Sequence, residues 1–285
     1  MGSCFAAHLS IRLQQSGFNA LYPFGALYNP VSIEQNCQRL IKGEAVSADE
    51  LFYQNERWHH FDFHSDYSHP DIDIALQQMN DAIQQGHQQW LQSKVLILTL
   101  GTAWCYEHVG TGKVVGNCHR VATQQFKRKR LSLAQIVASL AHICQQAADK
   151  QIIITVSPIR HWKDGAIANQ RSKALLLLAC EQLEQQFSNV TYFPSYEIMM
   201  DELRDYRFYA DDMMHPSTTA VQYICERFSA AFFDATTQQA CTEWNKIEQM
   251  RQHKPFHTQS EAYQQLQQKI TDSIRKWNAQ YKHHE

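Results

Sequence analysis

The stretch VLILTL (residues 95–100) decides the fold class, because five of its six side chains are apolar and Thr99 alone interrupts them. Such a run suits a strand of a parallel sheet that is covered on both faces. QIIITV (151–156) has the same character, and NALY (19–22) and VTYF (190–193) are shorter runs of the same kind. We therefore predict four strands.

Helical patterns separate and follow these runs, at residues 3–16, 31–42, 71–92, 132–149, 168–188 and 216–234. Ser132 is a favoured residue for a helix N-cap, and Pro216 suits a first helical turn. Alternation of strands with helices predicts an α/β fold in which helices cover both faces of a mostly parallel sheet. We expect a three-layer αβα sandwich, formed by residues 1–235.

Residues 236–285 differ in character, because they are rich in glutamine and follow a helical pattern interrupted at QHKPFH (252–257). The last helix carries one apolar stripe with spacings of three and four residues, formed by Tyr263, Leu266, Ile270, Ile274 and Trp277. The stripe is short for a coiled coil. We expect a helical C-terminal extension that packs back on the domain.

Composition and net charge limit the classes of partner that we expect this chain to bind. The chain has 285 residues and a formal net charge of −2, which does not favour binding to nucleic acid or to an anionic membrane. Its eight cysteines include no CxxC pair, as is typical of reduced thiols in the cytoplasm. No apolar run is long enough for a transmembrane helix. We expect a cytoplasmic protein with a small polar partner, and we interpret the basic run FKRKR (126–130) as a solvated turn.

Polar residues follow two of the predicted strands, where parallel sheets gather their ligands. Gly101 and Thr102 come directly after residues 95–100 and could present an N–H and a hydroxyl to an oxyanion, although a simple turn is the alternative. Arg160 and His161 come after residues 151–156. The arginine could bind an anionic group of a substrate or hold its loop to a carboxylate.

A DxxH pair follows the last predicted strand. Asp212 could accept a hydrogen bond from Nδ1 of His215, which would fix the tautomer and leave Nε2 free as a base. A DxxH by itself is also compatible with a purely structural role. A nucleophile is needed to complete the site, and Ser3 is either that nucleophile or the N-cap of the first helix.

The segment RWHHFDFHSDYSHP (57–70) is rich in groups that bind metals, namely His59, His60, Asp62, His64, Asp66 and His69. A metal site is one interpretation, but no HxxxH spacing on a clear helix supports it. We expect no metal, and we expect His64 and Ser65 to face a substrate or to anchor the loop.

Seven segments, taken together and in order, resemble the GSCFA-domain family: GSCFA (2–6), PFGALYNP (23–30), FDFHSDYS (61–68), LTLGTAW (98–104), GNCH (116–119), TVSPIRH (155–161) and RFYADDMMHPS (207–217). That family is similar to the SGNH/GDSL hydrolases. The resemblance implies a flavodoxin-like α/β fold and an esterase, lipase or acetylhydrolase activity. It also implies a strand immediately before Ser3, so we expect strand residues upstream of Met1 in the native protein.

The resemblance assigns roles to particular residues. Ser3 matches the nucleophile, and Asp212 and His215 match the DxxH that assists it. Gly25 matches a glycine of the oxyanion hole. Residues 101–103 match a Gly-x-Asn block, in which Ala103 replaces the asparagine. The missing donor costs about 3–4 kcal/mol of transition-state stabilisation unless another group replaces it, and the two candidates for that group are Asn117 and Asn29.

The function implied is ester hydrolysis or acyl transfer through an acyl-enzyme, without a cofactor, on a small acyl ester such as an acylated carbohydrate. The expected oxyanion hole consists of Gly25, Gly101, Thr102 and Asn117. The expected substrate contacts are Asn29, His64, Ser65, Trp104, His119, Arg160 and His161. The alternative is a binding module that keeps the fold but does not turn over a substrate.

Overall fold

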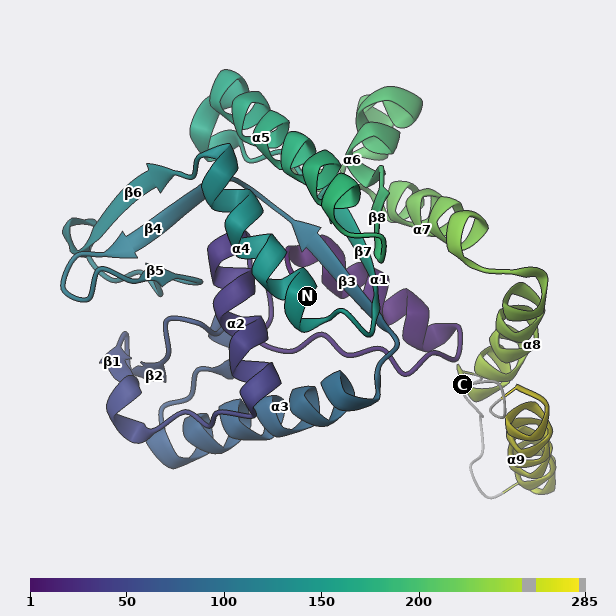
Figure 1. The fold of residues 1–285 in the computed structure, drawn as a ribbon. Coiled ribbons are helices and arrows are strands. Elements are labelled where there is room, and N and C mark those ends of the chain that lie inside the picture. The colour runs from purple at the N-terminus through teal and green to yellow at the C-terminus, as the bar shows by residue number, and fades with distance from the viewer. Residues whose placement is uncertain (253–259, 282–285) are drawn as a thin grey trace. The chain divides into compact units, whose positions relative to one another are not determined.

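The computed structural model describes residues 1–252 and 260–281 (Figure 1). The chain divides into two compact units. The first, here called the sheet unit, contains Met1–His8 and Leu21–Ile224. The second, here called the helical unit, contains Leu9–Ala20 and the chain from Cys225 onward.

The sheet unit is built on three parallel strands in the order β3 (Val95–Leu100), β7 (Gln151–Val156) and β8 (Val190–Phe193). Ile152 and Ile154 join the main core cluster, whereas the equally buried Ile153 between them points to the opposite face. The sheet is therefore buried on both faces. Three of the four predicted strands are confirmed.

The fourth predicted strand is wrong, because residues 19–22 form no strand. Residues 1–3 instead lie beside β3. The Ser3 N–H donates to the Thr99 carbonyl over 3.0 Å, and the Thr99 N–H donates to the Met1 carbonyl over 2.9 Å. Tyr22 contributes through its side chain, since its hydroxyl donates to the carbonyls of Gly2 and Ser3. The sheet edge thus ends at Ser3, immediately before the first helix.

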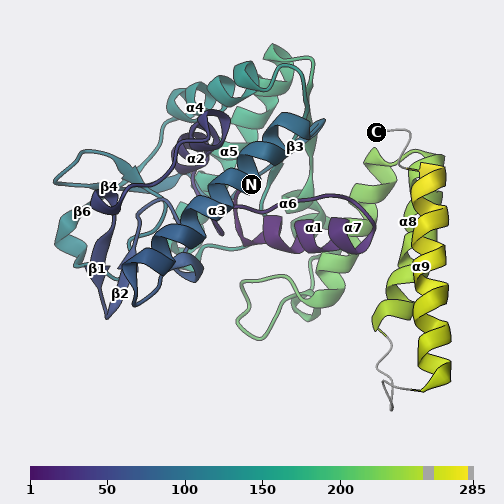
Figure 2. The ribbon, with the colours of Figure 1, turned by 90° about the horizontal axis from the view of Figure 1, so that it is seen from below.

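The helices agree with the predicted positions to within a few residues: α1 (Cys4–Gln15), α2 (Pro30–Lys42), α3 (Ile72–Gln92), α4 (Leu133–Gln146), α5 (Gly165–Gln186) and α7 (Thr218–Phe232). Ser132 caps α4 as predicted, in a capping box with Gln135. Pro216 is not a helical residue, because α7 begins two residues later. Helices α2, α4 and α5 lie side by side over one face of the sheet (Figures 1 and 2).

Smaller elements complete the sheet unit. A hairpin joins β1 (Phe52–Gln54) to β2 (Arg57–His59), and β4 (Trp104–His108) pairs antiparallel with β5 (Val114–Val115) and β6 (Phe126–Arg130). FKRKR is therefore a strand and not the turn that we predicted, because each of its residues pairs with one of β4 while most of the charged side chains stay exposed. Short helical turns include α6 (Ser195–Glu197) and the π-helix Ile198–Leu203, with 3₁₀ turns at Ala48–Glu50, Ser65–Tyr67, Thr123–Gln125, Trp162–Asp164 and Tyr206–Phe208.

The helical unit contains α8 (Ala235–Gln252) and α9 (Glu261–Tyr281). Its buried cluster includes Ala240, Ile247, Ile270 and Trp277, with Leu266 and Ile274 packed against it. The Trp277 indole N–H donates to the Ala240 carbonyl over 2.9 Å. The predicted apolar stripe of α9 therefore packs against α8, whereas residues 253–257 of the predicted break lie outside the described part of the chain. Within the described residues, every helix is too short or too polar to span a bilayer.

Candidate functional site

Asp212 and His215 form the pair that the sequence predicts, in the loop before α7. His215 Nδ1 lies 2.5 Å from Asp212 Oδ2, and Asp212 Oδ1 accepts the backbone N–H groups of Met214 and His215 at 2.9 Å each. These N–H donors, followed by the imidazole, lower the pKa of Asp212 to about 2. Met213 between them has a φ of 58°, an uncommon value for a residue other than glycine. The loop thus holds an ionised carboxylate against one imidazole nitrogen.

Ser3 and Cys4 differ sharply in exposure at the point where the sheet edge meets α1. Ser3 is 0% exposed, and its Oγ lies 3.1 Å from Thr99 Oγ1, so it points back at β3. Cys4 is the first residue of α1 and is partly exposed. Its thiol interacts with the Tyr28 hydroxyl. The predicted nucleophile is therefore fully buried, and its neighbour is not.

Lys173 lies under the carboxyl ends of β3 and β7. It is 1% exposed, and its Nζ donates to the carbonyls of Gly101 and Ser157 at 2.8 Å each. Burial lowers the pKa of Lys173 to about 7, although the nearby Cys4 raises it. Sequence reasoning missed this residue. The available signal was its spacing, since Lys173 falls on the buried face of α5 with Asn169 and Leu176.

His161 lies next to this lysine. Burial, followed by the charges of Lys173 and His215, lowers the pKa of His161 to about 3, so its ring is neutral at physiological pH. Its Nε2 is buried and has no hydrogen-bond partner among the described residues. The Tyr28 ring packs edge to face on the imidazole at 5.8 Å between centroids. Tyr28, His161 and Lys173 therefore form one cluster, whose members interact with Cys4 and with His215.

A pocket of about 270 Å³ adjoins the same loops. It is lined by Arg160, Trp162, Ala166, Asn169, Gln170, Tyr196, Met200 and Tyr206. The Arg160 guanidinium lies 4.2 Å from the ring centre of Tyr209, and the backbone N–H of Arg160 donates to the Met214 carbonyl over 3.3 Å. That bond joins the pocket wall to the loop that carries His215.

Comparison with known proteins tests the predicted family. Residues 1–228 match the model of the GSCFA family, and residues 244–284 match that of the GSCFA domain protein, C-terminal domain. The chain belongs to the GSCFA family. Searches of curated proteins and of solved structures each found no match.

The predicted oxyanion donors of the GSCFA protein are largely engaged with other parts of the chain. The N–H groups of Gly101 and Thr102 both donate to the Tyr28 carbonyl at 2.9 Å. The backbone N–H of Asn117 donates to the Phe61 carbonyl over 2.9 Å, and Asn117 Oδ1 accepts the N–H of His119 over 2.9 Å. The N–H groups of Gly101 and Thr102 could donate to an oxyanion only after their bonds to the Tyr28 carbonyl break. Gly25 is the remaining predicted donor of the oxyanion hole. Its φ is 74°, and its backbone lies close against the His64 Cβ.

Two predicted substrate contacts have structural partners. Asn29 is the N-cap of α2: its Oδ1 accepts the Ser32 N–H, and its Nδ2 donates to Ser32 Oγ, both at 2.9 Å. Trp104 on β4 lies under the Arg128 guanidinium at 4.4 Å from the ring centre. The structure therefore places Asn29 in a helix cap and Trp104 in the antiparallel sheet, and neither lines the pocket beside Arg160.

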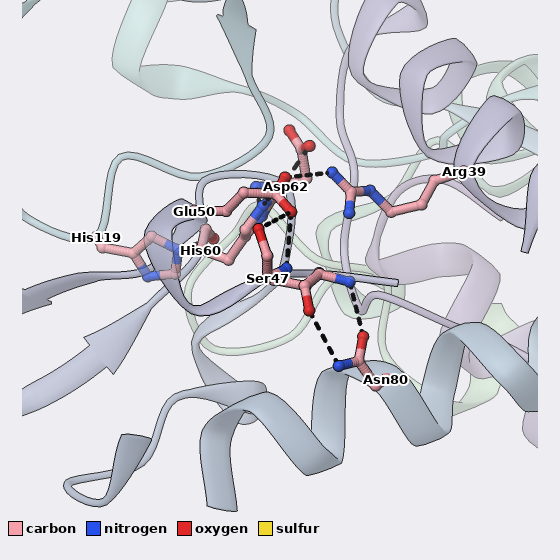
Figure 3. A network of polar contacts seen from close by, with 8 residues as sticks. Arg39, Ser47, Glu50, His60, Asp62, Asn80 and His119 are labelled. Carbon is pink, nitrogen blue, oxygen red and sulfur yellow. Dashed lines mark hydrogen bonds and ion pairs between the residues drawn. The ribbon is translucent and has the colours of Figure 1, made fainter. Parts of the chain in front are cut away.

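The histidine-rich segment of the GSCFA protein joins a polar network that extends from the buried His60 and His119 to the exposed Glu50 (Figure 3). Burial raises the pKa of Glu50, but the Arg39 guanidinium at 2.7 Å and the Ser47 N–H outweigh it and lower the pKa to about 2. His60 Nε2 lies 3.4 Å from the same carboxylate. The carbonyl of His60 contacts His119 Nε2 at 2.9 Å. This network ties loops of the sheet unit together.

The other members of this segment also bond to the protein. Ser65 Oγ lies 3.2 Å from His119 Nδ1, and burial lowers the pKa of His119 to about 4. His64 Nδ1 contacts Asp66. Within the described residues, no group of three or more His, Cys, Asp or Glu side chains is arranged to hold a metal ion. His64, Ser65 and His119 thus occupy loop-anchoring positions.

Lys173 makes stability depend on pH in a direction that can be measured. Its pKa is 10.5 in an unperturbed chain and about 7 in the fold, so between these values the unfolded chain holds a proton that the folded chain has lost. The free energy of unfolding therefore rises with pH, by at most about 1.4 kcal/mol per pH unit. We expect Lys173→Met to reduce this rise in urea titrations between pH 7 and about 8.5, below which unfolded cysteines stay mostly protonated. The Met1 amino group, whose pKa burial lowers to about 6, contributes the rise that remains below about pH 8.

Lys150→Met is the matched control, because Lys150 is a second buried lysine but lies beside the Asp149 carboxylate. The control should keep the slope of the wild-type protein. Parallel profiles for wild type and Lys173→Met over this pH range would contradict the assignment.

Proposed function

We propose that this GSCFA protein catalyses acyl transfer, most simply the hydrolysis of an ester of a small polar molecule, through a covalent acyl-enzyme. The observation that carries the proposal is the Asp212–His215 pair, in which a 2.5 Å contact and two backbone N–H bonds hold the imidazole in one orientation. Such a pair positions a histidine to take a proton from a nucleophile and return it to a leaving group.

The location of His215 supports this role. Burial and then the charge of His215 lower the pKa of His8. Burial, the charge of Lys173 and then that of His215 lower the pKa of His161. His8 lies one helical turn after Cys4, on the same side of α1. The imidazole is therefore near the start of α1, where a developing negative charge would also meet the positive end of the helix dipole. By resemblance to the SGNH/GDSL hydrolases, the fold would be a flavodoxin-like αβα sandwich with its nucleophile at the start of the first helix.

The substrate class follows from the pocket beside Arg160. Its aromatic walls, with Asn169 and Gln170, suit the faces and hydroxyls of a sugar, and Arg160 suits a carbonyl or an anionic group. Because this pocket and the His215 loop share the bond from Arg160 to Met214, a substrate in the pocket would have its ester near the imidazole. We propose an acylated carbohydrate or a similar polar ester.

The test is turnover by the purified full chain of p-nitrophenyl acetate, butyrate and decanoate, together with acetylated monosaccharides. We expect release of short acyl groups, faster than release of decanoate, and release of acetate from at least one acetylated sugar. Absence of turnover and of any acylated protein across the whole panel would contradict an acyl-transfer function and favour a binding module.

A further inference from the structure

We propose that Cys4, and not Ser3, carries the nucleophilic atom of this site. The inference rests on the proposed acyl-transfer function and concerns the atom that becomes acylated. Ser3 is 0% exposed and its Oγ is paired with Thr99 Oγ1, so an ester could reach it only if α1 separated from β3. The Cys4 sulfur lies one residue further along, at a partly exposed position in the first turn of α1.

Lys173 supplies an independent observation. A fully buried ammonium is costly unless an anion compensates its charge. Among the described residues, the two groups that accept hydrogen bonds from Lys173 Nζ are neutral carbonyls. The acidic group whose charge acts on Lys173 is the Cys4 thiol. A thiolate at Cys4 would compensate the buried charge, so the lysine is placed to stabilise the reactive form of this cysteine.

The thiol needs a base, and the cluster provides one. Burial raises the pKa of Cys4, which keeps the sulfur protonated until a neighbour takes the proton. The Tyr28 hydroxyl interacts with the sulfur and opposes this increase. His215 is the base, since its Nδ1 is held by Asp212 and its Nε2 can accept a proton. The charge of His215 acts on the pKa of His8, which places the imidazole near the first turns of α1.

The steps balance without a cofactor. His215 Nε2 takes the thiol proton while sulfur bonds to the ester carbonyl carbon, giving a tetrahedral oxyanion. When this collapses, the bond from carbon to the alcohol oxygen breaks, and the imidazolium gives its proton to the alcohol. Cys4 then carries a thioester. Water, deprotonated by His215, attacks that carbonyl and yields a carboxylic acid, while the sulfur leaves as a thiolate that regains the proton from the imidazolium.

The first experiment locates the acyl group. Wild type, Ser3→Ala, Cys4→Ala and Cys118→Ala are mixed with p-nitrophenyl acetate, quenched in acid and mapped by peptide mass spectrometry. Cys118 is the matched control because it is another partly exposed cysteine. We expect acetylated Cys4 that neutral hydroxylamine releases, and a loss of turnover of at least about 100-fold in Cys4→Ala. Ser3→Ala and Cys118→Ala should stay within about 5-fold of wild type, since neither removes the nucleophile.

Acetylation of Ser3, or loss of turnover in Ser3→Ala with full turnover in Cys4→Ala, would overturn the inference while leaving the proposed function in place. A second measurement needs no ester. Alkylation by iodoacetamide should be faster at Cys4 than at Cys118, and Lys173→Met and His215→Ala should slow it at Cys4 alone. If this holds while no ester turns over, the proposed function fails and the reactive cysteine stands. Equal rates at both cysteines, unchanged in these variants, would overturn the inference.

Discussion

His215→Ala should lower kcat/KM for ester hydrolysis by about 10²–10⁴-fold, the range that general acid–base catalysis contributes. The imidazole accepts the proton of the nucleophile and then donates it to the leaving alcohol, so its removal affects both halves of the reaction. The corresponding loss of transition-state stabilisation is about 3–5.5 kcal/mol. Steady-state kinetics with p-nitrophenyl acetate measures it.

Asp212→Asn separates positioning from proton transfer. The amide oxygen of asparagine could still accept the two backbone N–H bonds that shape the loop, but its NH₂ group would meet His215 Nδ1 and favour the wrong tautomer. We expect a large fall in kcat with a modest decrease in the free energy of unfolding, because the fold stabilises the charged form of Asp212 and the amide is neutral. His142→Ala, which removes a histidine that contacts Glu34, should keep full activity.

Equal activity of wild type and His215→Ala would contradict a role for the pair in catalysis.

Gly25→Ala should reduce the free energy of unfolding by about 2–5 kcal/mol, the sum of a left-handed backbone cost and an overpacking cost. Gly25 has a φ of 74°, and a Cβ added there would lie 2.3 Å from the Cβ of His64. Neither atom can move by a side-chain rotation, because both are fixed to their backbones. The loop of Gly25 and that of His64 would have to separate, which would also break the His64 N–H bond to the Phe24 carbonyl.

Gly112→Ala is the matched control, because Gly112 has a similar φ of 67° but nothing lies within 4 Å of the added Cβ. It should lose about 1–2 kcal/mol, from backbone conformation alone. A double-mutant cycle gives a second check. His64→Gly removes the opposing Cβ and should reduce the cost of Gly25→Ala to that of Gly112→Ala, whereas His64→Ala keeps the Cβ and should not. Equal costs at both glycines would show that the loops are not in contact.

The core of the fold could be predicted from local pattern, and the errors have specific causes. Residues 95–100 and 151–156 are long apolar runs, and burial on both faces is the one environment that suits them. Residues 19–22 have a similar composition but are short, and the edge beside β3 is occupied by residues 1–3 instead. FKRKR was misassigned as a turn because its charged side chains favour solvent. An exposed strand can nevertheless pair through its backbone while its side chains remain in water.

The candidate site could be predicted in part. Asp212 and His215 are three residues apart, so their contact is a local property of one loop, and the sequence was enough to propose it. Asn29 was a harder case, because an asparagine before a helix satisfies the helix end as readily as it binds a ligand. Lys173 could not be found by residue type, since a lysine in a helix is usually solvated and this one is buried by strands distant in sequence.

Sequence alone therefore established the α/β class, the family and the Asp212–His215 pair, because each depends on residues near one another in the chain or on motifs in a set order. Tertiary structure decided which side chain at the start of α1 faces outward. Ser3 and Cys4 are adjacent and both nucleophilic in type, and the difference between them arises from packing: β3 covers the serine, and Lys173 of α5 supplies a charge beside the cysteine.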